Sequence, residues 1–198
     1  MKLAILLSGR GSNFLSISKA IKNGKLNAEI VLVASNKADA KGLQKAMNMG
    51  YNTQVFDRSK FVEGREFANF ILEEFDRYRV EYVVLAGYLR KIPPRVIKSY
   101  HNKIINIHPA LLPKFGGKGM YGLNVHQSVL EARETHTGVT VHFVDDKYDH
   151  GEIIMQKSIP VFDDDTPEKL STRVLKLEHS FYPEVLESIS KQKYKGVE

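Results

Sequence analysis

Short apolar runs and amphipathic stretches alternate along the first half of the chain. The apolar runs are rich in β-branched residues, which is typical of strands buried on both faces of a sheet. The stretches between them carry apolar residues at helical spacing, most clearly the aromatic residues between Phe61 and Tyr78. The pattern predicts strands over 2–7, 29–34, 52–56, 82–86 and 103–107. Helices are predicted over 14–22 and 61–78, and two more are predicted between these strands, one that ends at Met49 and a short one that begins at Pro93.

The second half of the chain changes character after a glycine-rich segment at 116–122, which we expect to be a mobile loop at the mouth of a site. A helix is predicted over 123–134. Two strands, 137–144 and 153–161, flank an acidic loop and are expected to pair antiparallel, with Thr140 and His142 on one face. Thr166 is expected to cap a last helix that begins at Pro167 and runs to about Ser190.

The alternation of strands and helices predicts the fold class. Strands that alternate with helices form a parallel, doubly wound α/β sheet with helices on both faces, as in Rossmann-like folds. We expect about seven strands, mostly parallel, with one antiparallel element after the glycine-rich loop. No repeat or linker divides the chain, so residues 1–198 are expected to form one domain with a frayed tail at 191–198.

Composition narrows the class of function. The 198 residues are 42% hydrophobic and 26% charged, as in ordinary globular proteins. Cysteine is absent, which excludes disulfides and thiolate metal sites, and no stretch has the length of a membrane span or the form of a signal peptide. A cytoplasmic location is therefore expected. The formal charge is +6, but the basic residues are scattered and tryptophan is absent, so the chain lacks the aromatic and basic surface typical of nucleic-acid binding. Anionic small molecules are therefore the favoured ligands.

A turn at residues 8–13 joins the first predicted strand to the first predicted helix. Strand, glycine-containing turn and helix start together present free backbone N–H groups and the positive end of the helix dipole, which suit a phosphate. The sequence Ser-Gly-Arg-Gly-Ser-Asn matches neither a dinucleotide fingerprint nor a Walker A loop, so it suggests a single phosphate. The alternative is a tight turn in which Ser12 or Asn13 caps the helix.

The fifth predicted strand ends in polar side chains. Asn106 and His108 are two positions apart and therefore face the same side of the strand. Ligands bind at the carboxyl ends of the strands in open α/β sheets, and both side chains can donate and accept hydrogen bonds. The alternative is that this polar pair only satisfies backbone groups where the strand meets the loop.

Taken together and in order, these segments resemble one family, phosphoribosylglycinamide formyltransferase, the folate-dependent enzyme of purine synthesis. The resemblance extends over nearly the whole chain, and single segments of it would be weak signals. It rests on residues 8–13, 35–40, 83–90, 106–109, 111–114, 138–144 and Asp149.

The resemblance implies a formyltransferase fold and a catalytic trio of Asn106, His108 and Asp149. In formyl transfer from 10-formyltetrahydrofolate, donors aimed at the formyl oxygen stabilise the charge that develops there. Asn106 and a protonated His108 would supply these donors. Asp149 would raise the pKa of His108 and take the proton of the amine, directly or through water. Without the family pattern, Asp149 is a turn residue before Gly151.

The resemblance also implies ligand contacts and support residues. The ribotide, phosphoribosylglycinamide, is expected at Gly11, Ser12, Asn13, Lys176 and Glu178, with a solvated helix face as the alternative for the last two. His142 is expected to be a buried support residue and His126 to lie on a helix surface, and Leu112–Pro113 is a candidate cis bond. No metal is expected. The folate contacts are expected at Arg65, Leu89, Arg90, Lys91, Ile92, Asn106, Asp145, Asp146, Lys147, Tyr148 and Asp149.

The sequence departs from the family's pattern at three places: Ala110 stands where serine is common, His150 where glycine is common, and the glycine-rich loop is longer than in some relatives. These departures bear on loop geometry rather than on the trio.

Three other functions compete with ribotide formylation. Methionyl-tRNA formyltransferases share the trio but carry a further C-terminal domain, and formyltetrahydrofolate deformylases carry an N-terminal one. The predicted single domain favours neither. A non-enzymatic phosphate-binding module would need only the turn at 11–13, and the trio argues against it. The expected partners are small molecules, with no nucleic acid or membrane, and the chain is expected to be a monomer or a homodimer.

Overall fold

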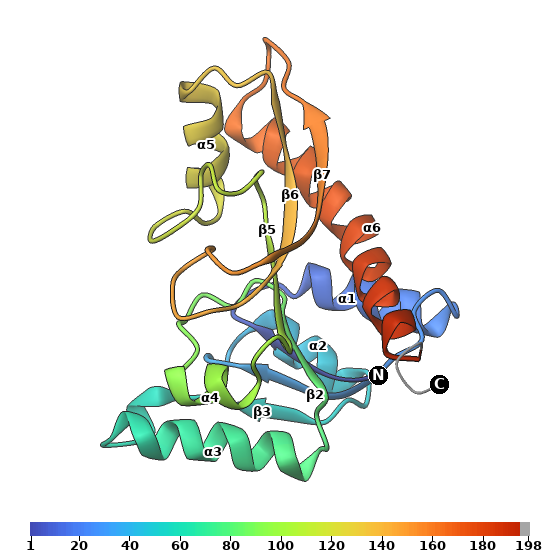
Figure 1. The fold of residues 1–198 in the computed structure, drawn as a ribbon, viewed down its shortest axis with the longest axis vertical. Helices are drawn as coiled ribbons and strands as arrows, with labels where there is room; N and C mark the ends of the chain where they lie inside the picture. Colours follow the sequence, from blue (N-terminus) through green and yellow to red (C-terminus); the bar gives the residue numbers. More distant parts are fainter. Residues whose placement is uncertain (195–198) are drawn as a thin grey trace.

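Seven strands form one sheet in the order β3-β2-β1-β4-β5-β6-β7 in the computed structural model, which describes residues 1–194 (Figure 1). The first five strands are parallel, while β6 runs antiparallel to β5 and β7 antiparallel to β6. The predicted doubly wound sheet, with an antiparallel element after the glycine-rich loop, is confirmed. The strands are β1 (Lys2–Leu7), β2 (Glu29–Ser35), β3 (Thr53–Val55), β4 (Tyr82–Leu85), β5 (Ile104–His108), β6 (His136–Phe143) and β7 (Ile153–Pro160).

Six α-helices and one 3-10 helix, η1 (Arg58–Lys60), connect the strands within the described residues. The last helix runs to Tyr194 and so includes four of the residues expected to fray, and Lys191 pairs with Glu187 one turn earlier at 3.2 Å. The rest of the expected tail, 195–198, lies outside the described residues. The α-helices are α1 (Ser12–Lys22), α2 (Lys41–Asn48), α3 (Gly64–Arg77), α4 (Pro94–Ser99), α5 (Leu123–Glu131) and α6 (Pro167–Tyr194).

The strands bury both of their faces, as the continuous apolar runs predicted. In β1, Leu3, Ile5 and Leu7 pack with residues of α1, α2, α5 and α6, whereas Ala4 and Leu6 pack with residues of α3 and α4. This division of the helices between the two faces is what doubly wound topology requires. None of the helices within residues 1–194 is long and apolar enough to cross a membrane.

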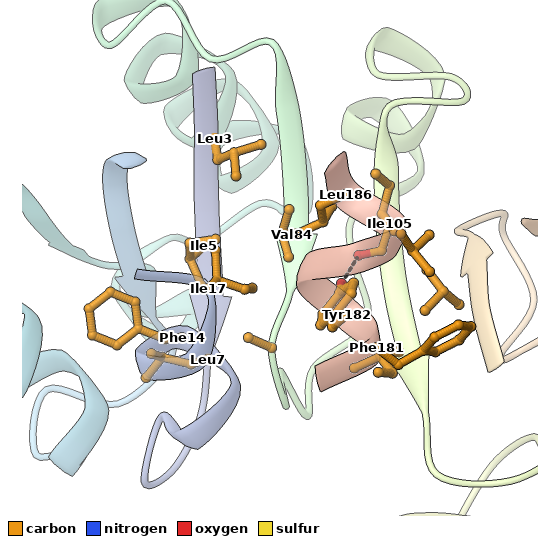
Figure 2. Close-up of a cluster of buried hydrophobic side chains, with 14 of the residues drawn as sticks. Leu3, Ile5, Leu7, Phe14, Ile17, Val84, Ile105, Phe181, Tyr182 and Leu186 are labelled. Carbon is orange, nitrogen blue, oxygen red and sulfur yellow. Dashed lines mark hydrogen bonds between the residues drawn. The ribbon is translucent and has the colours of Figure 1, made fainter. Parts of the chain in front are cut away.

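Helix α6 is anchored to the sheet by Tyr182, which is completely buried (Figure 2). Its hydroxyl oxygen lies 3.0 Å from the carbonyl oxygen of Ile105 and 3.2 Å from that of Leu85, so its single hydrogen is shared between β5 and β4. Glu178 lies one helical turn before Tyr182 on the same face of α6. The anchored tyrosine therefore fixes where Glu178 enters the region beyond the strand ends.

The order of the strands reverses between β1 and β4, and the loops that leave these two strands are tied together. The backbone N–H of Ser8 donates to the carbonyl oxygen of Gly87 at 3.0 Å, and the Ser8 hydroxyl accepts from the N–H of Leu89 at 2.8 Å. A crevice outside the carboxyl ends of the strands is expected at such a reversal.

Candidate active site

A cleft of about 470 Å³ lies at the carboxyl ends of β1, β4 and β5. The loops after these strands form its base, the glycine-rich loop and α5 form one wall, and α6 forms another. It brings together the predicted trio and most of the predicted ribotide contacts. Its lining residues include Gly11, Ser12, Asn13, Leu89, Asn106, His108, His126, Tyr148, Asp149, Ser171, Leu175 and Glu178.

The turn at one end of the cleft begins α1 without a side-chain cap. Gly11 is the N-cap residue with φ +72°, and neither Ser12 nor Asn13 caps the helix, so the alternative of a side-chain-capped turn is not what the structure contains. A left-handed φ favours glycine, and a Cβ atom on Gly11 would lie 2.8 Å from the Cα of Gly42 on α2. The first turn of α1 therefore presents uncapped N–H groups to the cleft.

Gly42 is a residue that the sequence analysis missed. Its N–H donates to the carbonyl oxygen of Gly9 at 2.9 Å, and a Cβ atom on Gly42 would lie 2.9 Å from the Cα of Gly11. The two glycines thus let α2 pack directly against the turn. A glycine inside a helix costs helical stability, and this cost is the signal in the sequence that could have pointed to a close backbone contact.

Glu178 enters the same end of the cleft from α6. It is buried, and its Oε2 accepts a hydrogen bond of 2.6 Å from the Nδ2 of Asn13. Burial raises the pKa of the Glu178 carboxyl to about 7, although the bond from Asn13 opposes the shift. The Oδ1 of Asn13 is enclosed and has no partner in the described part of the chain. The pair therefore carries hydrogen-bonding capacity that a ligand can use.

Asn106 and His108 end β5 and face the cleft from the same side, as predicted. Antiparallel pairing with β6 sets Asn106 opposite His142 and His108 opposite Thr140. The Nδ1 of His142 donates to the carbonyl oxygen of Phe143 at 2.7 Å, and its Nε2 lies 3.1 Å from the Nδ2 of Asn106 and 3.7 Å from the Oδ1 of Asp149. His142 is thus the buried support residue that was expected. It fixes the orientation of the Asn106 amide.

His108 and Asp149 meet beneath the glycine-rich loop. The Nδ1 of His108 lies 3.5 Å from the Oδ2 of Asp149, while its Nε2 donates to the carbonyl oxygen of Phe115 at 2.8 Å. The N–H of Gly117 donates to the same carboxylate at 2.9 Å. Asp149 has φ +53°, a left-handed conformation in which its carboxylate turns inward from the acidic loop. The trio therefore comes together from β5 and a loop far along the chain.

The pKa of His108 differs from the expectation. Burial lowers it below its ordinary value, and this effect outweighs the charge of Asp149 and the bond to Phe115, which raise it. Asp149 thus has the predicted effect on the pKa of His108, but burial of the ring has a larger effect, and the net pKa is lowered rather than raised. For Asp149, burial raises the pKa, but His142, His108 and the N–H of Gly117 together hold it below its ordinary value. Asp149 is therefore a carboxylate at neutral pH.

His126 is a second correction. We expected it on the surface of a helix, but it is only 3% exposed and lines the cleft. Helix α5 packs on α6, with Val129 in the same buried cluster as residues of α6, and His126 lines the cleft together with residues of the glycine-rich loop. Both α6 and the glycine-rich loop thus cover α5, and His126 lies on a part of the helix that would be exposed if α5 packed on α6 alone. The peptide bond Leu112–Pro113 is cis, as expected.

A small pocket of about 90 Å³ adjoins the cleft and gathers most of the predicted folate contacts. The ammonium of Lys91 lies 5.7 Å from the ring centre of Tyr148, so the loop after β4 and the acidic loop face each other. Leu89 lines the main cleft instead, and Asp146 is exposed and lines neither space. The pocket is lined by Arg90, Lys91, Ile92, Asn106, Asp145, Lys147, Tyr148 and Asp149, among others.

Comparison with known proteins agrees with this geometry. The formyl transferase family model matches residues 1–186. The chain belongs to the formyl transferase family.

Several similar proteins are named phosphoribosylglycinamide formyltransferase. Phosphoribosylglycinamide formyltransferase of Escherichia coli (strain K12) is 38% identical over 186 residues, which cover 94% of this chain and 85% of the relative. The chloroplastic protein of that name from Arabidopsis thaliana is 41% identical over 195 residues, which cover 98% of this chain and 67% of the relative. The crystal structure of the Brucella melitensis protein matches with a TM-score of 0.87 at 41% identity, and the match covers 95% of this chain and 94% of that one. The resemblance stated from the sequence is confirmed.

Other formyl transferase relatives are longer than the match. The chain spans 62% of the cowpea (Vigna unguiculata) protein and 18% of the trifunctional purine biosynthetic protein adenosine-3 of chicken (Gallus gallus). Within residues 1–194, no group of three or more histidine, aspartate or glutamate side chains is arranged to hold a metal ion.

Besides Asp146, two predicted contacts of this formyl transferase lie outside both the cleft and the small pocket. Lys176 is exposed on α6 and lines a groove with Ser12 between α1 and α6. The positions that line the cleft are 171, 175 and 178, which share one face of the helix, and position 176 points away from that face. Arg65 lines a hollow with Pro93 and Pro94. A third space, of about 690 Å³, shares those prolines and also Arg90, Lys91 and Ile92, and so it connects the Arg65 hollow to the small pocket.

Proposed function

We propose that the protein transfers the formyl group of 10-formyltetrahydrofolate to the amine of phosphoribosylglycinamide, giving formylglycinamide ribonucleotide and tetrahydrofolate in de novo purine synthesis. The observation that carries this proposal is the convergence of Asn106, His108 and Asp149 in one cleft, between a phosphate-type turn and a second pocket. A cleft with one anion-binding end and one neighbouring pocket suits the transfer of a group between two substrates.

The ribotide phosphate binds at the uncapped N-terminus of α1, where Gly11, Ser12 and Asn13 present N–H groups. Glu178 accepts hydrogen bonds from the ribose hydroxyls, and its partner Asn13 links the ribose end to the phosphate end. Lys176 adds positive charge from the groove on the outer side of Ser12. This placement directs the amine of the ribotide toward His108.

The folate binds between the loop after β4 and the acidic loop, against Arg90, Lys91, Ile92 and Tyr148. Its benzoylglutamate tail follows the connecting space toward Arg65, whose guanidinium pairs with the tail's carboxylates. Leu89 and Asn106 lie where the small pocket meets the cleft. Residues 145–149 form the outer wall.

The reaction follows from the groups at that meeting point. The amine attacks the formyl carbon, a new carbon–nitrogen bond forms, and the formyl oxygen gains negative charge, which N–H groups of Asn106 and protonated His108 stabilise. His108 turns its Nε2–H from the carbonyl of Phe115 to this oxygen. Asp149 takes a proton from the amine, directly or through water. The oxygen then reforms the carbonyl bond, the bond to the folate nitrogen breaks, that nitrogen takes the proton held by Asp149, directly or through water, and tetrahydrofolate leaves.

The test measures consumption of 10-formyltetrahydrofolate by the purified protein with and without the ribotide. Consumption that requires the ribotide supports the proposal. Consumption without the ribotide would indicate a deformylase, and consumption only with aminoacylated initiator tRNA would indicate a methionyl-tRNA formyltransferase. Binding of the ribotide with no consumption at all would indicate a phosphate-binding module.

The proposal places the protein in the cytoplasm, where the absence of cysteine suits reducing conditions. The relatives from Arabidopsis thaliana and Vigna unguiculata are named as chloroplastic proteins.

A further inference from the structure

His126 carries hydrogen-bonding capacity that the proposed reaction does not use. The residue is only 3% exposed, yet it lines the cleft. Its Nδ1 is enclosed and has no partner among the described residues. A buried imidazole normally finds hydrogen-bond partners, because an unpaired polar atom inside a protein costs free energy. Neither ring nitrogen has a hydrogen-bond partner among the described residues, so the nitrogen that is not enclosed is free to bind a ligand in the cleft.

The two ring nitrogens of His126 have different surroundings. Nδ1 is the enclosed nitrogen, and Nε2 is therefore the one left to face the cleft. Burial and the neighbouring His108 lower the pKa of His126 to about 4, so the ring is neutral at working pH and holds one proton. An enclosed N–H without an acceptor is rarer than an enclosed acceptor without a donor. The proton is therefore on Nε2, which donates into the cleft.

The position of His126 selects the substrate. It lines the main cleft together with His108 and Glu178 and does not line the small pocket assigned to the folate. The ribotide extends from the turn at Gly11 to the reacting amine beside His108. Between its ribose and its amine, the ribotide presents one uncharged acceptor, the carbonyl oxygen of the glycinamide group. A neutral N–H donor beside His108 matches that oxygen.

We propose that His126 is a substrate-contacting residue whose Nε2–H donates a hydrogen bond to the glycinamide carbonyl of the ribotide. This inference rests on the proposed function for the identity of the ligand. The bond would hold the glycinamide arm so that its amine faces the formyl carbon. It would also explain why a histidine, rather than an apolar residue, occupies this enclosed position of α5.

The test compares three substitutions that differ in where they place a donor. His126→Leu removes both nitrogens, His126→Asn places an amide near the Nδ1 position, and His126→Gln places one near the Nε2 position. His101→Leu, on an exposed histidine, is the matched control. Ribotide affinity is measured by calorimetry, the KM of both substrates by turnover, and folding by thermal unfolding.

We expect His126→Leu and His126→Asn to weaken ribotide binding roughly tenfold, the effect of one lost hydrogen bond with an unpaired group left behind. His126→Gln should restore most of the affinity, and the folate KM should stay within about twofold in all variants. Rescue by Asn but not by Gln would overturn the inference, since it would assign the role to the enclosed Nδ1. Equal ribotide affinity in all variants, with only a lower Tm, would also overturn it.

The calorimetric measurement separates this inference from the proposed function. If the wild-type protein binds the ribotide but transfers no formyl group, the proposed reaction is wrong, and the affinities of the variants still decide the role of His126. If the wild-type protein does not bind the ribotide, both proposals are wrong. If transfer occurs and the affinities do not differ, only the inference on His126 fails.

Discussion

The Nδ1 of His108 lies 3.5 Å from the Oδ2 of Asp149, and the same carboxylate accepts the N–H of Gly117 from the glycine-rich loop. Asp149 is thus shared between the ring of His108 and the loop above it. A neutral His108 that donates through Nε2 turns the lone pair of Nδ1 toward a carboxylate, which is unfavourable, whereas the protonated ring satisfies both neighbours. The pair is therefore a balance between burial, which disfavours the charged ring, and Asp149, which favours it.

Replacing Asp149 with asparagine removes the charge and keeps the shape of the side chain. We expect kcat to fall by about a hundredfold or more, as for other lost acid–base and oxyanion groups, while the KM of each substrate changes less. NMR titration should show a lower pKa for His108 in the variant. If kcat and the titration both stay at wild-type values, Asp149 is only a turn residue.

The opposing effects of burial and Asp149 on the pKa of His108 also predict how the activity of the wild-type protein changes with pH. The protonated His108 is lost as pH rises through its pKa, and burial places that pKa below the ordinary value of 6.5. The catalytic contribution of the charged ring should therefore decline at a lower pH than for an exposed histidine. Asp149→Asn should move the decline lower still, which pH–rate profiles of kcat can measure. A shift toward higher pH would contradict the assigned coupling.

Gly11 and Gly42 form a contact that tolerates no side chain on either residue. Gly11→Ala should cost about 1–3 kcal/mol of stability from its left-handed backbone and also push α2 from the turn. Gly42→Ala should also push α2 from the turn, but without the cost of a left-handed backbone. Both should raise the KM of the ribotide more than that of the folate. Gly50→Ala is the control, because Gly50 also has a left-handed φ, of +81°, and a Cβ atom there would meet nothing within 4 Å. Equal effects on both substrates would argue against a phosphate at this turn.

Arg65 is the most remote of the predicted folate contacts, and its proposed role is electrostatic. Arg65→Ala should raise the KM of a folate that carries its glutamate tail by a factor of a few, because an exposed ion pair contributes about 0–1 kcal/mol. The effect should vanish at high salt and with a folate analogue that lacks the glutamate. Lys22→Ala, a lost charge at the exposed end of α1, serves as the control. Equal effects with and without the glutamate would remove Arg65 from the site.

The sequence was sufficient for the sheet because each strand carries its own signal. Continuous apolar runs such as 2–7 and 82–86 identify strands buried on both faces, and the polar carboxyl end of β5 identifies the edge of the sheet where the cleft lies. The errors concern burial by elements distant in the chain. The enclosure of His126 depends on α6 and the glycine-rich loop, and the lowered pKa of His108 depends on how completely the fold excludes water. Local patterns do not contain either quantity.

Glu178 provides a prediction in which stability and function oppose each other. Burial raises the pKa of its carboxyl from the ordinary value of 4.5 to about 7 in the folded protein. Between these values the unfolded chain ionises first, so the contribution of this group to stability is full below about pH 4.5 and is lost as pH rises through about 7. Glu178→Gln removes the penalty of a buried charge and retains an oxygen that can accept from Asn13.

We therefore expect Glu178→Gln to match the wild-type protein in stability near pH 4.5 and to exceed it at pH 8 by about 3 kcal/mol, the size of the pKa shift in free energy. Thermal unfolding at the two pH values measures this, with a rise in Tm of several degrees at pH 8 only. Ribotide affinity should fall in the same variant, because an amide accepts hydrogen bonds from ribose hydroxyls less strongly than a carboxylate does. A gain in stability that is equal at both pH values would show that the effect comes from packing. A variant less stable than the wild type at pH 8 would show that the buried carboxylate is stabilised by Asn13 more than it is penalised by burial.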